Sequence, residues 1–159
     1  MRLIDTKHIL KINEQIRLLA IEDLTIPYTG YEDYPIQMSK IEALIENIPK
    51  SDILTIATYY LKYLILLQPF ADGNHRTALV AVELLFEMNC DEYNLIFEYS
   101  VEEAEQFQKD LYRLRFRTYQ TYEQHSTDVL KETENAVDSF CRDFIKNHLT
   151  KSDEHVQSS

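Results

Sequence analysis

The sequence predicts a single domain of the all-α class. Only 2 glycines and 4 prolines occur among 159 residues, so few positions interrupt regular structure. Apolar residues recur at steps of three and four, which is the spacing of one helix face. A chain of this length with 45% hydrophobic residues can fill one core. We therefore expect one domain over residues 1–149 and a polar, disordered tail over residues 150–159.

The first expected helix covers residues 5–22, because its isoleucines fall on one stripe. The stretch TIPYTGYEDYP follows this helix and contains two prolines, one glycine and three tyrosines. Such a composition favours an extended or hairpin-like segment with its turn at Gly30. It is the only good strand candidate in the sequence.

Two helices follow the extended segment. Ser39 and Glu42 fit a capping box that opens a short helix, and Pro49 ends it. Residues 52–67 are apolar around almost the whole circumference of a helix, so we expect this helix at the centre of the core. Gln68 must lie at its end, because the residue before a proline avoids helical dihedral angles.

Three more helices complete the expected fold. Residues 74–88 carry a regular apolar stripe. Ser100 and Glu103 form a second capping box, which opens a helix that runs to about Tyr119. Residues 128–149 place their apolar side chains on a single face, as expected for a helix that covers the core.

The charge and the apolar pattern exclude several classes of partner. Lysine and arginine total 16 against 27 acidic residues, and the net charge of −11 argues against nucleic acid as a ligand. The longest apolar stretch, residues 59–67, is interrupted by Lys62 and is too short to span a bilayer. The N-terminus has no apolar run typical of a signal peptide. We therefore expect a cytoplasmic protein with no membrane or nucleic-acid partner.

The stretch PFADGNHR reads as a turn that leads directly into a helix, and a helix start attracts anions. Gly73 permits the positive φ of a backbone nest around phosphate oxygens, and Asn74 can cap the helix or hold the loop. Arg76 opposes the helix dipole unless an anion binds nearby, and Asp72 would repel that anion unless Mg²⁺ lay between them. The alternative is a plain turn in which Asp72 is a cap and Arg76 a surface charge.

The stretch QPFADGNHRTAL resembles the signature of the Fic/Doc (Fido) family, HPF-x-(D/E)-G-N-(G/K)-R. The apolar helix before the motif, the start of the helix after it and the hairpin-like segment upstream occur in the family's order, so the resemblance covers about residues 5–120. It implies a compact helical Fido domain with a short β-hairpin flap. The matching residues are Pro69, Phe70, Asp72, Gly73, Asn74 and Arg76.

The resemblance also implies a function. Most members bind ATP or another nucleotide and transfer AMP to a hydroxyl group of a target protein. By this resemblance Asp72 would hold Mg²⁺, Gly73 and Asn74 would cradle the phosphates, and Arg76 would neutralise their charge. The hairpin-like segment resembles the family's flap, which lies over the site and pairs with an extended target segment by strand addition. The flap residues would be Tyr28, Gly30, Tyr31 and Tyr34.

Three positions depart from the family pattern. Gln68 replaces the histidine that serves as general base, and an amide cannot accept the proton, which typically costs about 10²- to 10⁴-fold in rate. His75 stands where the family has glycine or lysine, and it could contact phosphate, face solvent or act as a displaced base. Leu79 stands where AMP-transferring members often carry a second arginine, and RTAL resembles the Doc branch, which transfers a phosphoryl group.

Three hypotheses remain open from the sequence. The chain is a nucleotide-binding relative that has lost its base, an active divergent transferase of the toxin type, or a non-catalytic helical interaction module. Many relatives carry an inhibitory helix with the pattern S/T-x-x-x-E-G/N. Here Thr150 and Glu154 alone have that spacing, and His155 follows where glycine or asparagine belongs. A separate antitoxin is therefore a possible partner, and the same absence is expected of a protein with little activity to restrain.

Overall fold

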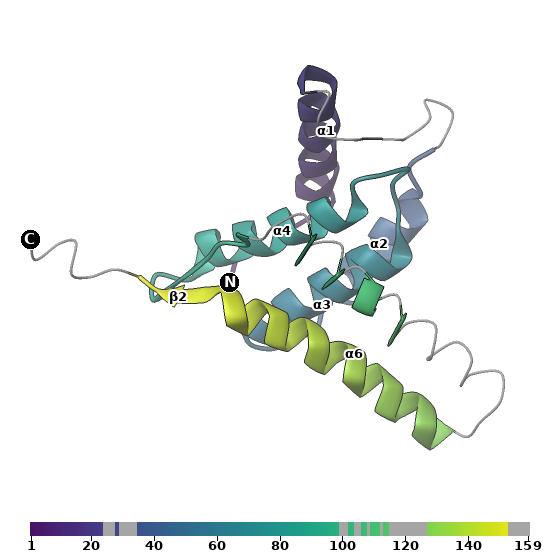
Figure 1. Ribbon diagram of the computed structural model, residues 1–159, viewed down its shortest axis with the longest axis vertical. Helices are drawn as coiled ribbons and strands as arrows, with labels where there is room; N and C mark the ends of the chain where they lie inside the picture. Colours follow the sequence, from purple (N-terminus) through teal and green to yellow (C-terminus); the bar gives the residue numbers. More distant parts are fainter. Residues whose placement is uncertain are drawn as a thin grey trace, which may run out of the picture.

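The structure is a computed structural model that describes residues 1–23, 28, 35–98, 102–103, 106–107, 109–111, 113–114 and 127–152. Helices dominate it, which confirms the predicted all-α class (Figure 1). Within the expected helix over residues 100–119, the described residues are helical. The elements in chain order are α1 (Thr6–Glu22), α2 (Met38–Glu46), α3 (Ile53–Leu67), α4 (Asn74–Asn89), β1 (Tyr93–Leu95), α6 (Thr127–His148) and β2 (Leu149–Lys151).

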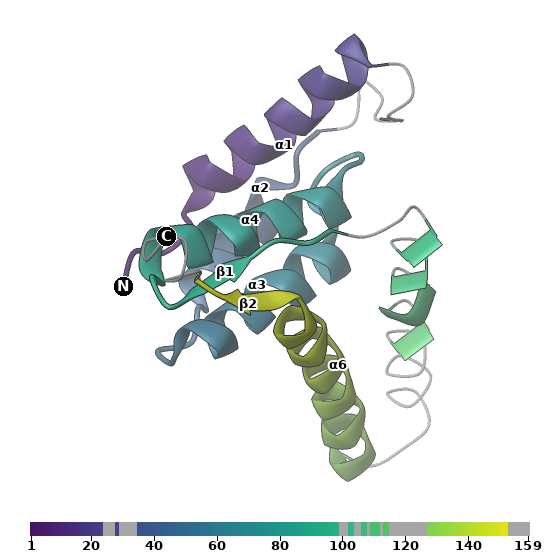
Figure 2. The same ribbon diagram turned by 60° about the vertical axis from the view of Figure 1, so that its left-hand side comes forward.

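Helix α3 forms the centre of the core, as its apolar circumference predicts. It packs against α2, α4 and α6, while α1 packs against α4 and α2. Figure 2 shows α1 crossing over α4, with one end extending beyond the other helices. The phenol of Tyr60, fully buried in α3, donates a hydrogen bond of 2.7 Å to the carbonyl of Ile4. This contact fixes the start of the chain to the centre of the core.

Helices α1 and α3 each begin with a side-chain cap from a residue nearby in sequence, whereas the start of α2 is bonded to a distant loop. Helix α1 begins with a capping box between Asp5 and His8, which the sequence analysis missed. Asp52 caps α3 by accepting a hydrogen bond from the backbone N–H of Thr55 at 2.8 Å.

The capping box predicted at Ser39 and Glu42 is wrong. Helix α2 begins at Met38, so Ser39 already lies in its first turn. Gln37 is the N-cap residue, and its backbone N–H donates to the carbonyl of Pro69 at 2.9 Å. A long-range contact with the loop before α4 therefore accompanies this helix start.

A small antiparallel sheet joins the segment after α4 to the end of α6. Tyr93 pairs with Lys151, and Leu95 pairs with Leu149. The expected disordered tail from residue 150 is therefore wrong at its start, because residues 150 and 151 belong to β2. Burial of Leu95 at 6% exposure stabilises this pairing. The hairpin predicted around Gly30 lies outside the described residues, apart from Tyr28.

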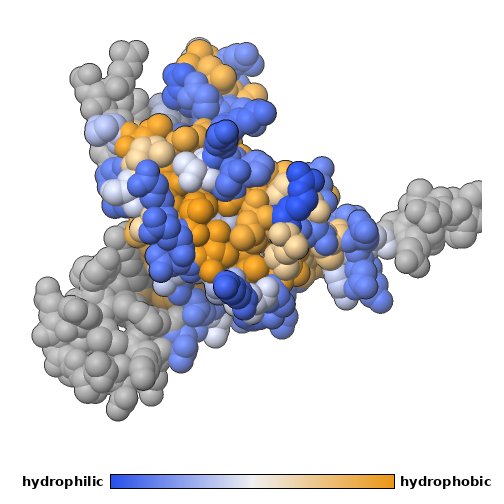
Figure 3. Space-filling model, turned by 180° about the vertical axis from the view of Figure 1, so that it is seen from behind, coloured by the Kyte–Doolittle hydropathy of each residue, from blue (hydrophilic) through white to orange (hydrophobic). Residues whose placement is uncertain are grey.

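Hydrophobic side chains gather on the face shown in Figure 3. An apolar hollow of about 730 Å³ lies between the start of the chain, α2 and α3, and its lining includes Leu3, Ile45 and Ile56. None of its lining residues belongs to the loop between α3 and α4. Among the described helices, none combines the length and the apolar character that crossing a bilayer requires.

Candidate functional site

The loop between α3 and α4 begins at Gln68, which ends α3 as predicted. Its φ of 48° and ψ of 61° are left-handed, and it is the non-glycine residue with positive φ in the described part of the chain. Such a conformation costs roughly 1–2 kcal/mol for an L-residue, so surrounding contacts must hold it. One such contact comes from Lys40, whose Nζ donates to the carbonyl of Leu67 at 2.7 Å. Lys40 is not among the residues predicted for the site.

Asn74 holds the loop in shape from the first position of α4. Its Oδ1 accepts a hydrogen bond from the backbone N–H of Phe70, and its Nδ2 donates to the Phe70 carbonyl, both at 2.9 Å. The Phe70 side chain is buried beneath the loop at 3% exposure. Of the two roles predicted for Asn74, the structure places its side chain in the loop-holding one.

Helix α4 starts without the usual side-chain cap. Gly73 precedes it with φ of 72° and ψ of 13°, the left-handed conformation predicted from the sequence. Gly73, as the N-cap residue, makes no side-chain capping bond, and the first turn contains no acidic residue. The acidic side chain at the positive end of the α4 dipole is that of Asp72, which precedes the N-cap residue.

Asp72 and Arg76 lie together at this helix start. Asp72 Oδ1 accepts a hydrogen bond from the Gly73 N–H at 2.6 Å and lies 3.9 Å from a terminal nitrogen of Arg76. Both side chains are about one-third exposed, at 30% for Asp72 and 31% for Arg76. Amides and a guanidinium are suitable ligands for phosphate oxygens, and a carboxylate is suitable for a hard cation.

The chemistry of the described side chains is compatible with Mg²⁺ bound together with a nucleotide, because one carboxylate lies beside the helix start. The described residues contain no cluster of three or more histidine, cysteine or acidic side chains that would enclose a metal. Mg²⁺ ordinarily keeps several waters and binds through one or two carboxylates plus phosphate oxygens. Asp72, beside the start of α4, is a carboxylate of the kind that this smaller set requires.

The side chain of His75 is partly buried, not solvent-exposed. Its ring stacks on Phe107 with centroids 4.9 Å apart and an interplanar angle of 16°. Its Nε2 atom is buried and has no hydrogen-bond partner among the described residues. Burial, together with the charge of Arg76, lowers the pKa of His75 to about 4, so the ring is neutral at pH 7. The predicted alternative of simple solvent exposure is wrong.

Asn13 and Tyr28 are the site residues that complete the surroundings of the loop. Asn13 Nδ2 donates to the carbonyl of Asp72 at 3.0 Å, and its Oδ1 accepts from the Tyr28 hydroxyl at 3.1 Å. Asn13 lies outside the motif and is not among the predicted site residues, although a polar residue four positions after Ile9 and three before Ile16 falls on the buried face of α1. A polar residue on an otherwise apolar helix face indicates a specific hydrogen-bonding role, and this pattern is visible in the sequence.

Of the predicted flap residues, Tyr28 is described, and it lies beside the loop. Tyr28 is there, and burial, followed by the nearby Asp72 charge, raises the pKa of its phenol. The other predicted flap residues, Gly30, Tyr31 and Tyr34, lie outside the described residues.

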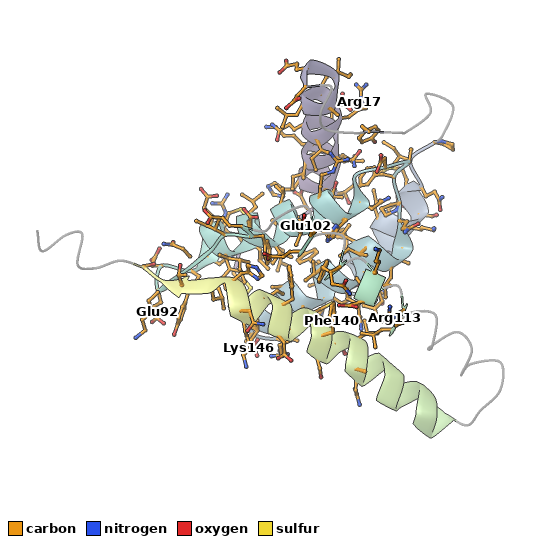
Figure 4. The ribbon with its side chains drawn as sticks, in the orientation of Figure 1. Arg17, Glu92, Glu102, Arg113, Phe140 and Lys146 are labelled. Carbon is orange, nitrogen blue, oxygen red and sulfur yellow. The ribbon has the colours of Figure 1, made fainter. Side chains whose placement is uncertain are left out.

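Figure 4 shows Arg17 on the end of α1 that extends away from the other helices. Its guanidinium pairs with Glu14 on the same helix at 2.6 Å.

One of three comparisons with known proteins gives a match. The family model described as the Fic/DOC family matches residues 3–86, which is more than half of the chain. The matched region contains α1, α2, α3, the loop and most of α4. Comparison with curated proteins and with solved structures gives no match. Because the matched region includes both the helices and the loop that carries the signature, the chain belongs to the Fic/DOC family.

Proposed function

We propose that this protein binds a nucleotide at the start of α4 and is weak or inactive as a transferase because Gln68 replaces the general base. The observation that carries the proposal is the start of α4 itself. It follows a left-handed glycine, and its first turn carries Arg76, which pairs with Asp72 at 3.9 Å. Both side chains remain about one-third exposed, so a guanidinium for phosphate oxygens and a carboxylate for a cation lie side by side at the positive end of the helix.

The phosphates of ATP or a related nucleotide would bind to the amides of Asn74, His75 and Arg76 and to the Arg76 guanidinium. Asp72 would hold Mg²⁺ together with phosphate oxygens and water. Bound there, Mg²⁺ would neutralise charge on the phosphates. The neutral His75 ring would contribute no charge, because its burial keeps it unprotonated at pH 7.

The proton-transfer step is where this protein would fail. Gln68 has an amide at the position of the family's histidine, and an amide neither accepts nor releases a proton at ordinary pH. His75 is a poor replacement, because its Nε2 is buried and its pKa of about 4 makes it a weak base. Nucleotide binding requires neither residue as a base, so binding would persist while transfer is slow.

The partners follow from the same family membership. A protein with an exposed hydroxyl would be the target, and a separate antitoxin would be a possible inhibitor. Both belong to the proposal. The strongly negative net charge of −11 is unfavourable for nucleic acid as an alternative partner, because both would be negatively charged.

Restoring the base tests the proposed function directly. The parent protein, Gln68→His and Gln68→His/Arg76→Ala would each be incubated with labelled ATP, Mg²⁺ and a cell lysate. We expect Gln68→His to label protein at a rate at least about 10²-fold above that of the parent. The double variant should show no such increase. The double variant controls for labelling that does not use the phosphate site. Equal labelling by the parent and by Gln68→His would show that Gln68 is not the limiting residue.

A further inference from the structure

Asn13 is a buried polar residue on α1, and its side-chain hydrogen bonds to the described residues lead to the candidate phosphate site. It is 5% exposed and lies on the same helix face as Ile9, Ile12 and Ile16. Burying an amide without partners is costly, so its contacts must compensate for the lost hydration. Those contacts therefore indicate what this position does.

Asn13 links the last residues of the loop to the first turn of α4. Its Nδ2 donates to the Asp72 carbonyl at 3.0 Å and to Thr77 Oγ1 at 3.1 Å. Its Oδ1 accepts from the Tyr28 hydroxyl at 3.1 Å. The orientation of the amide follows from chemistry, because a carbonyl oxygen can only accept and so requires Nδ2 opposite Asp72.

The same residues pack closely against the backbone at Gly73. A Cβ atom built on Gly73 would lie 3.1 Å from Asn13 Nδ2, 3.2 Å from Ile16 Cγ2 and 3.3 Å from Tyr28 Cε2. These distances leave little room, so α1 and the Tyr28 ring support one side of the peptide that precedes α4.

We propose that Asn13 is the positioning residue of the phosphate site, and that it acts by fixing the Asp72 carbonyl and the Tyr28 ring against the start of α4. This inference rests on the proposed function, because its consequence is nucleotide affinity. Its two donated bonds hold residues 72 and 77 on either side of the helix start. Its accepted bond holds Tyr28 as a wall beside Gly73. An aspartate at this position would place an oxygen against the Asp72 carbonyl and would not substitute.

The test compares Asn13→Ala with a matched control at the other end of α4. Asn89 makes the same kind of contacts: its Nδ2 donates to the carbonyls of Arg2 at 2.7 Å and Leu85 at 2.8 Å, and its Oδ1 accepts from the Arg2 N–H at 2.6 Å. Asn89→Ala therefore removes three similar hydrogen bonds far along the same helix. Three quantities would be measured for each protein: the free energy of unfolding in urea, the exchange rates of the amides at residues 73–76 without nucleotide, and the Kd for ATP with Mg²⁺.

We expect both variants to be less stable, but only Asn13→Ala to change the site. Its amides at residues 73–76 should exchange on the order of tenfold faster, and its Kd for ATP should rise on the order of tenfold. Tyr28→Phe should raise the Kd in the parent and have no further effect in the Asn13→Ala background. If Asn13→Ala does not fold, Thr77→Val removes one of the two anchors and should shift exchange and Kd in the same direction.

Two outcomes overturn the inference, and they differ. If Asn13→Ala loses stability while its amide exchange and its Kd equal those of the parent, then Asn13 is structural only and the proposed function stands. If the parent itself gives no saturable binding of ATP with Mg²⁺, the proposed function fails and the positioning role fails with it. The titration of the parent separates these two results.

Discussion

At the scale of single residues, the sequence located the loop but not the contacts that hold it. Gln68 at a helix end and Gly73 at a positive φ follow from local rules for proline and glycine, and the structure confirms both. Asn13 and Lys40 could not be found in that way, because their partners lie 59 and 27 residues away along the chain. The burial of His75 does not follow from local sequence, because its stacking partner Phe107 belongs to a distant segment.

The buried His75 ring should make the stability of the protein sensitive to acid. Its pKa is about 4 when folded and about 6.5 when unfolded, so the unfolded chain binds more protons between these values. Stability therefore falls as the pH drops below about 6.5, and the loss levels off below about 4. At pH 5 we expect His75 to account for a loss on the order of 2 kcal/mol.

The measurement for His75 is urea unfolding of the parent and of His75→Phe between pH 7 and pH 4.5. Phenylalanine keeps an aromatic ring against Phe107 and removes the titrating group. The variant should lose less stability than the parent over this range. Parallel pH profiles for the two proteins would show that the folded ring titrates normally.

At the scale of helices and strands, periodicity predicted most of the helices but could not predict the sheet. The bounds of α1, α3, α4 and α6 agree with the apolar stripes to within one residue at each end. Strands β1 and β2 are three residues each and pair across a long stretch of chain, so neither carries a local pattern. The start of α2 was misplaced because Gln37 is bonded to the loop at Pro69.

An ion pair joins helix α6 to α3, and its lysine is buried while its aspartate is about half exposed. Lys62 is 8% exposed, and its Nζ lies 2.6 Å from Asp138 Oδ1. Burial lowers the pKa of Lys62, but the hydrogen bond and charge of Asp138 outweigh that effect and raise it. Among the described residues, the ammonium group pairs with the Asp138 carboxylate of the neighbouring helix, and it lies 4.4 Å from the centre of the Tyr63 ring.

Removing that carboxylate should destabilise the protein more than removing the pair. Asp138→Asn leaves a buried ammonium without its counter-charge, which we expect to cost about 1–3 kcal/mol in the free energy of unfolding. Lys62→Met/Asp138→Asn should recover part of this loss, because the methionine has no charge to bury. Urea unfolding at pH 7 measures both. A double variant no more stable than Asp138→Asn would contradict this account of the pair.

At the scale of the whole molecule, the site depends on contacts between elements that are distant in the chain. Helix α1 supports the start of α4, α2 contacts the loop at Pro69, and α6 covers α3 from outside the matched family region. The sequence resemblance predicted the family and the order of the helices. It did not predict that α1 would supply a buried amide to the loop, because that requires the packing of α1 on α4.

The central claim is that the start of α4 binds the phosphates of a nucleotide. The most direct test is calorimetric titration of ATP with excess Mg²⁺ into the parent, Arg76→Ala and Arg142→Ala. Arg142 is a control arginine that bonds to Thr55 at the other end of α3, at 2.9 Å. We predict saturable binding by the parent, a Kd raised about tenfold or more in Arg76→Ala, and no change in Arg142→Ala. Absence of saturable binding by the parent, or an equal Kd for the parent and Arg76→Ala, would contradict the claim.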